Sequence, residues 1–346
     1  MPLPSSGQIA FSNIATELTI ASSNLSLRSM SSTAGKAVPD SISEFYNYSH
    51  GVSADYLVIA GGGSGGWGGG NSGYGGAGGG GAGGYKEGAL TFNRNVSYAI
   101  TVGGGGPAQD NMITNRNGSP SSIASLVTTA GGGTGAADWY GGNIGTSGGS
   151  GGGSHINIYS RSEVNQASGI SGQGYAGGPS YDKSYTDGDA EGGYYTKTSE
   201  NPGGGGGGGA GGAGGVWAPA GLVYAYEQEV NGGPGGVGIV SSITGTAIGR
   251  GGGGGGGGLR ASSAIHGGSY NIDYGGTVQA VVNTGGGGKG SNSHQSFPNN
   301  TSGASGVVII RILSSVASSV VAVGASVSTY SIYTVYTFNG SGTIQF

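Results

Sequence analysis

The sequence contains no cysteine among its 346 residues. The fold therefore uses neither disulfide bonds nor thiolate metal sites, and the redox compartment cannot be inferred from cysteine usage. Proline is also scarce, at ten residues, and glycine does not recur at every third position as it does in collagen. These absences leave a fold that is stabilised by its backbone and its apolar side chains alone.

Charge is the second shortage. Only 8% of the residues are charged, whereas about 25% is usual for a soluble domain. The formal net charge is −4, so the high net charge that accompanies low hydrophobicity in disordered chains is missing. There is no basic patch, and we therefore expect no nucleic-acid partner.

Long apolar runs are missing as well. No stretch approaches the roughly 18 apolar residues that a membrane-spanning helix requires. The N-terminus lacks the basic start and apolar core of a secretory signal. We expect a protein that leaves its cell by another route or stays inside it.

Glycine is what the sequence has instead, with 87 of 346 residues. It is concentrated in long runs at 61–84, 203–215 and 251–258. A flexible linker is the usual interpretation of such runs. These runs recur, however, and each is bordered by apolar or aromatic residues, which linkers seldom are. We therefore interpret them as the core of the protein.

The spacing of the interruptions supports a regular conformation. Several interruptions fall three residues apart, namely Ala210 and Ala213, Ser64 and Trp67, and Tyr74 and Ala77. Three is the period of the polyproline-II helix, in which only glycine fits where backbones pack closely. A 13-residue run such as 203–215 would span about 40 Å at 3.1 Å per residue. We expect several such rods side by side, bonded through their backbones, with Trp67 and Tyr74 serving to pack them.

Residues 1–51 differ from the rest because they contain little glycine. Ser12 to Leu18 and the capping box Ser41–Glu44 predict two short helices. The segment is too small to fold robustly alone. It is either a lead-in to the next domain or a docking element that needs a partner. The candidate docking residues are Phe11, Leu18, Leu25, Leu27, Phe45 and Tyr46.

Residues 52–313 repeat one unit, an apolar strand that runs into glycine. The predicted strands are 56–60, 96–102, 122–129, 237–248, 277–283 and 307–312. Because 57–60 and 307–312 have the same character, we expect them to pair in one small sheet. Residues 314–346 form a β-rich tail in which Asn339-Gly340 predicts a hairpin with 343–346 as its return strand. The tail forms a small terminal unit or an edge that pairs between subunits.

No motif predicts catalysis or a cofactor. The stretch 285–289 begins like a phosphate-binding loop, but Gly290 stands where Ser or Thr is required. Asp187, Asp189 and Glu191 fit the first half of a calcium loop, whose twelfth position is Thr198 and not Glu. A solvated acidic loop is the better interpretation, and we assign no metal site. The four histidines are scattered without metal-ligand spacing.

The segments between the glycine runs are rich in aromatic and polar residues. Tyr and Trp supply rigid, amphipathic contact area, which suits binding loops. The same residues also suit packing over exposed glycine backbone, and the sequence does not separate these two roles. The binding candidates are Trp139, Tyr140, Tyr175, Tyr181, Asp182, Tyr185, Tyr194, Tyr195, Trp217, Tyr224, Tyr226 and Tyr270.

Several of these motifs occur in the order found in a known family. The sequence YLVIAGGG at 56–63, ITVGGGG at 100–106, GVVIIRI at 306–312 and YTVYTFNGSGTIQF at 333–346 resembles the glycine-rich domain of bacteriophage tail and tail-fibre proteins. The N-terminal segment is similar to the leader of many phage structural proteins. The resemblance covers most of the chain, although its unequal rods and long inserts depart from the compact adhesins.

The resemblance implies a mainly β and irregular fold, in which polyglycine-II helices pack as a sandwich with short strands. It implies a virion protein of the tail fibre or tail tip, made in the host cytoplasm, that recognises the host surface without catalysis. Residues 1–51 would dock to other tail or baseplate proteins, and the aromatic loops would bind a glycan or an outer-membrane protein. Fibres are often trimeric, so a homotrimer is one expected assembly.

Two other functions stay open at this point. A purely structural virion component, such as a baseplate part, a connector or a capsid fibre, would use the aromatic residues for subunit packing. An ice-binding or extracellular adhesive protein would use a flat polyglycine face, although the leader does not fit that function.

Overall fold

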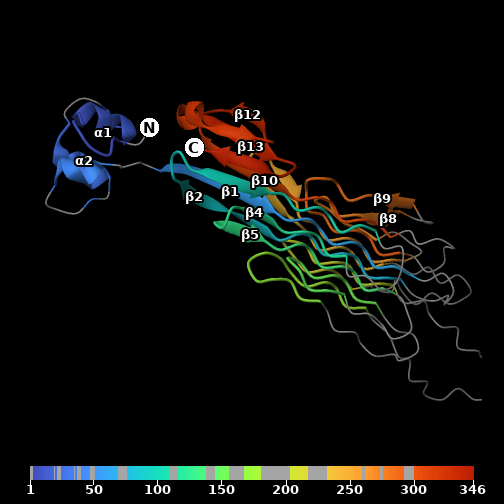
Figure 1. The fold of residues 1–346 in the computed structure, drawn as a ribbon. Helices are drawn as coiled ribbons and strands as arrows, with labels where there is room; N and C mark the ends of the chain where they lie inside the picture. The colour runs from blue at the N-terminus through green and yellow to red at the C-terminus, as the bar shows by residue number, and fades with distance from the viewer. Residues whose placement is uncertain are drawn as a thin grey trace, which may run out of the picture.

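The fold is known from a computed structural model. It describes residues 3–18, 20–21, 25–34, 36, 40–46, 51–68, 76–108, 116–137, 145–155, 167–180, 203–216, 232–258, 262–272, 276–291 and 300–346. The described residues are mainly β, with few helical turns, as predicted. An N-terminal lobe, a pair of sheets and a bundle of glycine runs follow one another along the long axis (Figure 1).

The N-terminal lobe packs three short helices around a small apolar core. The helices are α1 (Phe11–Glu17), α2 (Leu27–Thr33) and the 3₁₀ helix η1 (Ile42–Phe45). The first predicted helix is confirmed, and the second is the single turn η1. Helix α2 was not predicted, although Ser26 caps it by accepting a hydrogen bond from the Ser29 amide at 3.0 Å.

The first sheet contains the predicted pairing of 57–60 with 307–312. Strands β1 (Val52–Ile59) and β10 (Val307–Leu313) are antiparallel, with Leu57 opposite Ile309. The sheet order is β12-β13-β10-β1-β2, where β2 is Tyr85–Phe92, β12 is Ser326–Tyr330 and β13 is Tyr333–Phe338. Strands β2 and β12 were not predicted.

The second sheet has the order β11-β14-β3-β4-β5. Its strands are β11 (Val321–Val323), β14 (Gly342–Gln345), β3 (Ser97–Thr101), β4 (Ser121–Ile123) and β5 (Val127–Thr129). The single strand predicted over 122–129 is wrong. It is the hairpin β4–β5, in which Ala124 turns the chain at a φ of +44°.

The C-terminal tail belongs to both sheets. The predicted hairpin between 331–338 and 343–346 is wrong, because β13 pairs with β10 and β12 whereas β14 pairs with β3 and β11. Asn339-Gly340 therefore carries the chain from one sheet to the other. The tail strands complete the sheets of residues 52–313 within the same chain, and the short 3₁₀ helix η3 (Ser314–Ser319) connects β10 to β11.

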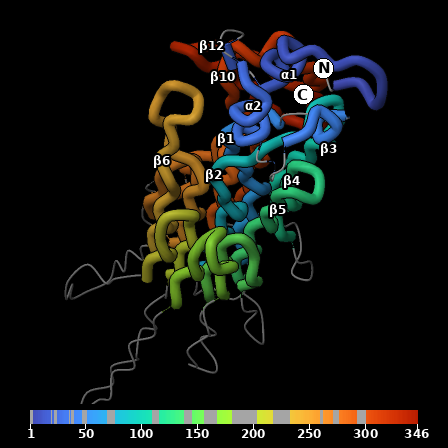
Figure 2. The backbone as a smooth tube through the Cα atoms, turned by 90° about the vertical axis from the view of Figure 1, so that its left-hand side faces the viewer, coloured from blue at the N-terminus to red at the C-terminus, as the bar shows by residue number. Residues whose placement is uncertain are grey.

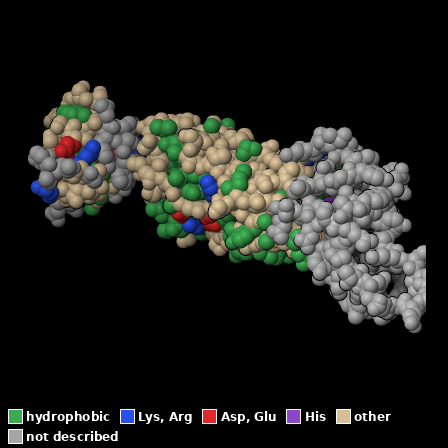
Figure 3. Space-filling model, turned by 90° about the horizontal axis from the view of Figure 1, so that it is seen from below, with side chains coloured by type: hydrophobic (Ala, Val, Ile, Leu, Met, Phe, Trp, Pro, Cys, Tyr) green, Lys and Arg blue, Asp and Glu red, His purple; other side chains and the backbone are tan. Residues whose placement is uncertain are grey.

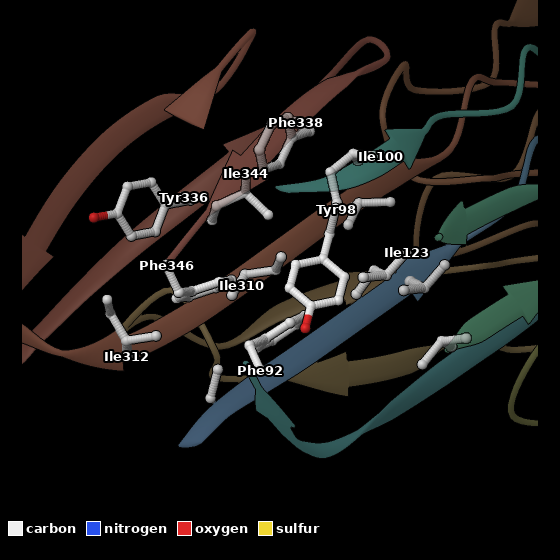
Figure 4. Close-up of a cluster of buried hydrophobic side chains, with 14 of the residues drawn as sticks. Phe92, Tyr98, Ile100, Ile123, Ile310, Ile312, Tyr336, Phe338, Ile344 and Phe346 are labelled. Atoms are coloured by element: carbon white, nitrogen blue, oxygen red, sulfur yellow. The ribbon is translucent and has the colours of Figure 1, made fainter. Parts of the chain in front are cut away.

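The main core lies between the two sheets. Figure 4 shows aromatic and aliphatic side chains from both sheets directed toward one another. The Phe92 ring stacks on Phe346 at a centroid distance of 4.4 Å and meets the edge of Tyr98 at 4.9 Å. Ile310 and Ile344 are buried in the same cluster. Aromatic pairs of this geometry add to the free energy gained from apolar burial.

The outer face of the first sheet is covered by a second hairpin and by the glycine runs. The strand predicted over 237–248 is wrong, because it is the hairpin of β6 (Ile239–Ser241) and β7 (Ile248–Arg250). Ile243 from its turn and Ala210 from a glycine run pack on Leu57 and Ile309. A last small pair, β8 (Tyr270–Ile272) and β9 (Gly276–Val278), lies farther along the bundle (Figure 1).

A polar bridge joins this hairpin to the first sheet. The Arg311 guanidinium donates to Asp55 Oδ2 at 2.6 and 3.0 Å and to the Tyr330 hydroxyl at 2.6 Å. The Tyr330 hydroxyl in turn donates to the Ile243 carbonyl at 3.2 Å. The hairpin turn therefore rests on a charged network as well as on apolar contacts.

Replacing Tyr330 with phenylalanine is expected to lower the free energy of unfolding by about 1–2 kcal/mol, because the Ile243 carbonyl and one Arg311 N–H both lose a partner. Urea denaturation of the variant and the wild type measures the difference. An unchanged midpoint would contradict a stabilising role for this bridge.

Candidate functional site

The glycine runs form a hydrogen-bonded bundle that extends from the ends of the strands. We call the runs 60–68, 76–84, 103–108, 116–119, 130–137, 145–155, 174–180, 203–216, 232–238, 251–258, 284–291 and 300–306 the glycine bundle. Backbone N–H groups of one run donate to carbonyls of other runs throughout. The runs are therefore the structural core of the protein's long part, as the sequence indicated.

Run 76–84 lies at the centre of such a network. The Gly80 amide donates to the Gly288 carbonyl at 2.7 Å, while the Gly80 carbonyl accepts from the Gly254 amide at 2.9 Å. Along the run the partner changes at each residue and returns at every third. Its amides donate in rotation to the segments 285–291, 130–136 and 205–208. Its carbonyls accept from the segments 60–66, 251–257 and 150–153.

The run at 203–215 has the same periodic bonding but not the predicted length. The prediction of one rod of about 40 Å is wrong, because the chain turns back after Ala210. The Gly209 amide donates to the Gly212 carbonyl at 2.8 Å, and the Gly206 amide donates to Gly215 at 3.1 Å. Two shorter antiparallel runs result. Ala210 and Ala213 therefore lie on either side of a turn and do not mark successive turns of one rod.

Backbone contact between the runs explains why the residues must be glycine. A Cβ atom on Gly207 would lie 1.9 Å from the Gly80 carbonyl oxygen, and one on Gly80 would lie 2.3 Å from the Gly63 oxygen. Such distances leave no space for any side chain. At Gly104, on the surface, a Cβ would meet nothing within 4 Å. Trp67, predicted to pack, is half-buried, whereas Tyr74 lies outside the described residues.

The bundle has two different ends. Strand β1 continues into run 60–68, which leads away from the sheets, and run 76–84 brings the chain back into β2. The chain repeats this course throughout the bundle. Its described residues stop and resume at the end opposite the N-terminal lobe, which we call the distal end (Figures 1 and 2). The gaps there are 69–75, 109–115, 138–144, 156–166, 181–202, 217–231, 259–261, 273–275 and 292–299.

Polar side chains hold the last described residues of the distal end in place. Asn300 Nδ2 donates to the Gly65 carbonyl at 3.2 Å, and Ser154 Oγ donates to the Gly178 carbonyl at 3.1 Å. The buried His155 ring lies with Nδ1 at 3.1 Å from the Gly76 carbonyl oxygen. These side chains bond main-chain carbonyls where the runs finish. They fix the positions from which the connecting segments depart.

Most predicted binding residues fall in those connecting segments and lie outside the described residues. These are Trp139, Tyr140, Tyr181, Asp182, Tyr185, Tyr194, Tyr195, Trp217, Tyr224 and Tyr226, together with the weak calcium candidates Asp187, Asp189 and Glu191. The described residues that flank each of these segments belong to the distal end. The sequence did not predict that these separate segments depart from one end of the bundle.

Two predicted binding residues are described, and they lie apart from each other. Tyr270 begins β8 and is half-buried, close to the distal end (Figure 1). Tyr175 is 52% exposed, but its amide donates to the Gly209 carbonyl at 3.1 Å, beside the turn that faces the sheets. The structure therefore does not group Tyr175 with the distal segments.

The docking residues predicted in the N-terminal lobe are largely its core. Leu18 and Phe45 are buried, with Leu25, Leu27 and Tyr46 packed against them, so the prediction that Leu18 and Phe45 face a partner is wrong. Phe11 is on the surface. The sequence gave no signal for the ion pair between Glu17 and Arg94 at 3.7 Å, which joins the lobe to the loop after β2.

One ionisable side chain lies deep in the bundle. Lys289 is fully buried, and its amide donates to Thr301 Oγ1 at 2.7 Å. Burial lowers the pKa of the Lys289 ammonium to about 7. No group of three His, Asp or Glu residues that could hold a metal ion occurs in the part of the chain that the structure describes. None of the helices within the described ranges is long and apolar enough to span a bilayer.

Comparison with known proteins gives one match. A family model described as a glycine-rich domain matches residues 41–313, which include the sheets' central strands and almost the whole glycine bundle. No curated protein and no solved structure matches the chain.

Proposed function

This chain belongs to the glycine-rich domain family, and from that premise we propose that it is a bacteriophage tail-fibre or tail-tip protein whose distal end recognises the host surface by non-catalytic binding. The observation that carries the proposal is the placement of the connecting segments. Every gap in the bundle is flanked by residues of the distal end, on the side away from the N-terminal lobe (Figure 1).

We further propose that the glycine runs are polyglycine-II helices. The support is the rotation of hydrogen-bond partners with a period of three, which is the period of this helix class. A run that contacts six neighbours through its backbone has little freedom to bend. It therefore provides a rigid scaffold for the segments at its end, as functional loops generally require.

The composition of the distal segments suits a neutral or glycan-like receptor. They contain tyrosine and tryptophan beside Asp and Asn, a combination that gives stacking area and hydrogen bonds at low entropic cost. Figure 3 shows few charged side chains on the described face, so stacking and hydrogen bonding would dominate over charge attraction. On this proposal, the N-terminal lobe lies at the virion side.

Replacing Tyr181, Tyr185 and Tyr194 together with serine is expected to weaken binding to host cells at least about tenfold, because aromatic anchors carry most of the binding energy in such interfaces. The labelled full-length protein would be titrated onto cells of the strain on which the virus grows. The matched control is Leu126→Ser, which changes an exposed residue at the sheet end.

The proposal fails if the triple variant and the control bind cells as well as the wild type does. Absence of cell binding by the wild-type protein, with normal incorporation into virions, would instead favour a purely structural virion component.

A further inference from the structure

Large aliphatic side chains are exposed on three turns at the sheet end of the glycine bundle. Val240 and Ile248 belong to the β6–β7 hairpin, Ile265 to the next turn, and Val281 and Val282 to the turn that precedes run 284–291. Their exposed fractions are 54%, 37%, 50%, 55% and 68%. We call these five residues the aliphatic ridge.

The three turns are neighbours in space. The His266 ring packs so closely on β7 that a Cβ at Gly249 would lie 2.0 Å from its Cδ2 atom. The Val281 amide donates to the Gly267 carbonyl at 3.0 Å, which joins the second turn to the third. In Figure 2 the hairpin labelled β6 projects beyond the bundle, so its side chains are open to a partner.

The ridge also has no exposed charge close to it in the chain. Within the described parts of 232–291, the charged residues are Arg250 and Lys289. Both are buried, at 8% and 0% exposure. A partner that placed a charge against this ridge would desolvate it with nothing opposite to pair it, which is costly.

We propose that the aliphatic ridge is an interface between two copies of this chain. Exposed apolar patches of this kind mark interaction sites in soluble proteins. The partner must itself be poor in charge, and this chain, with 8% charged residues, meets that condition. A ridge meeting its own copy across a twofold axis would bury Val and Ile on both sides and no charged group. This inference does not depend on the receptor-binding proposal.

The test is sedimentation equilibrium of the full chain at total concentrations between about 1 and 100 µM. We expect reversible association of the wild type. Val282→Lys and Ile265→Lys should each weaken it at least tenfold, because each buries an ammonium in an apolar contact. The matched control is Val323→Lys, which changes an equally exposed valine on β11 in the second sheet. It should associate as the wild type does.

Two results would overturn the proposal. One is a monomer at every concentration, including the case in which the ridge variants lose only their incorporation into virions, because a different protein would then cover the ridge. The other is association that both ridge variants retain or that Val323→Lys removes equally. Thermal melting of each variant confirms that these surface substitutions leave the fold intact.

Discussion

Replacing Gly207 with alanine is expected to lower the free energy of unfolding by about 4 kcal/mol or more, a large part of a typical domain's stability. The new Cβ would lie 1.9 Å from the Gly80 carbonyl oxygen, so the two runs must separate. Separation stretches the bonds from the Gly207 amide to Gly254 and from the Gly236 amide to Gly207, both 2.8 Å. Each broken bond between buried backbone groups adds about 1 kcal/mol or more.

The matched control is Gly104→Ala. Gly104 is exposed, and a Cβ there would meet nothing within 4 Å. We expect a change within about 0.5 kcal/mol, or a slight gain, because alanine restricts the unfolded chain more than glycine does. Chemical denaturation of the three proteins gives both values. Equal stability of Gly207→Ala and Gly104→Ala would mean that the runs are not packed at backbone contact.

Lys289→Met is expected to stabilise the protein at pH 6 by about 3–5 kcal/mol and to remove a rise in stability at alkaline pH. Burial lowers the pKa of Lys289 from 10.5 to about 7 in the folded protein. Below pH 7 the lysine is charged in both the folded and the unfolded chain, so the folded protein bears the full cost of a buried ammonium. Methionine has a similar length and no charge.

The direction of the pH dependence follows from proton binding. Between about pH 7 and 10.5 the unfolded chain holds a proton at Lys289 that the folded protein has lost, so wild-type stability rises with pH through this window. Unfolding free energies measured from pH 6 to 10 test this, with Lys86→Met on the partly exposed side of β2 as the control. A wild-type profile that stays flat between pH 7 and 10 would contradict the lowered pKa.

Side-chain patterns predicted the fold where side chains face a core. The apolar stretches 57–60 and 307–312 face one another in the first sheet because both are buried on each face. The hairpins at 122–129 and 237–248 were missed because their turns depend on backbone conformation at Ala124 and Gly245, which have φ of +44° and +90°. Ala124 does not signal a turn by its residue type.

Glycine runs give no such pattern, and this limited the prediction of the bundle. The turn after Ala210 was missed because glycine is equally acceptable in a rod and in a turn. The site could be predicted only as a set of aromatic segments. Their common end follows from which runs are antiparallel, and that is decided by backbone bonds between residues far apart in the chain, such as Gly80 and Gly254.

The most direct test of the central claim is amide hydrogen exchange of the full-length protein. If the glycine runs are the core, the amides of 77–84 and 204–210 will exchange as slowly as those of β1 and β10, because each donates to a buried carbonyl of another run. If they exchange at the rate of an unstructured peptide while the strands stay protected, the runs are linkers and the account is wrong.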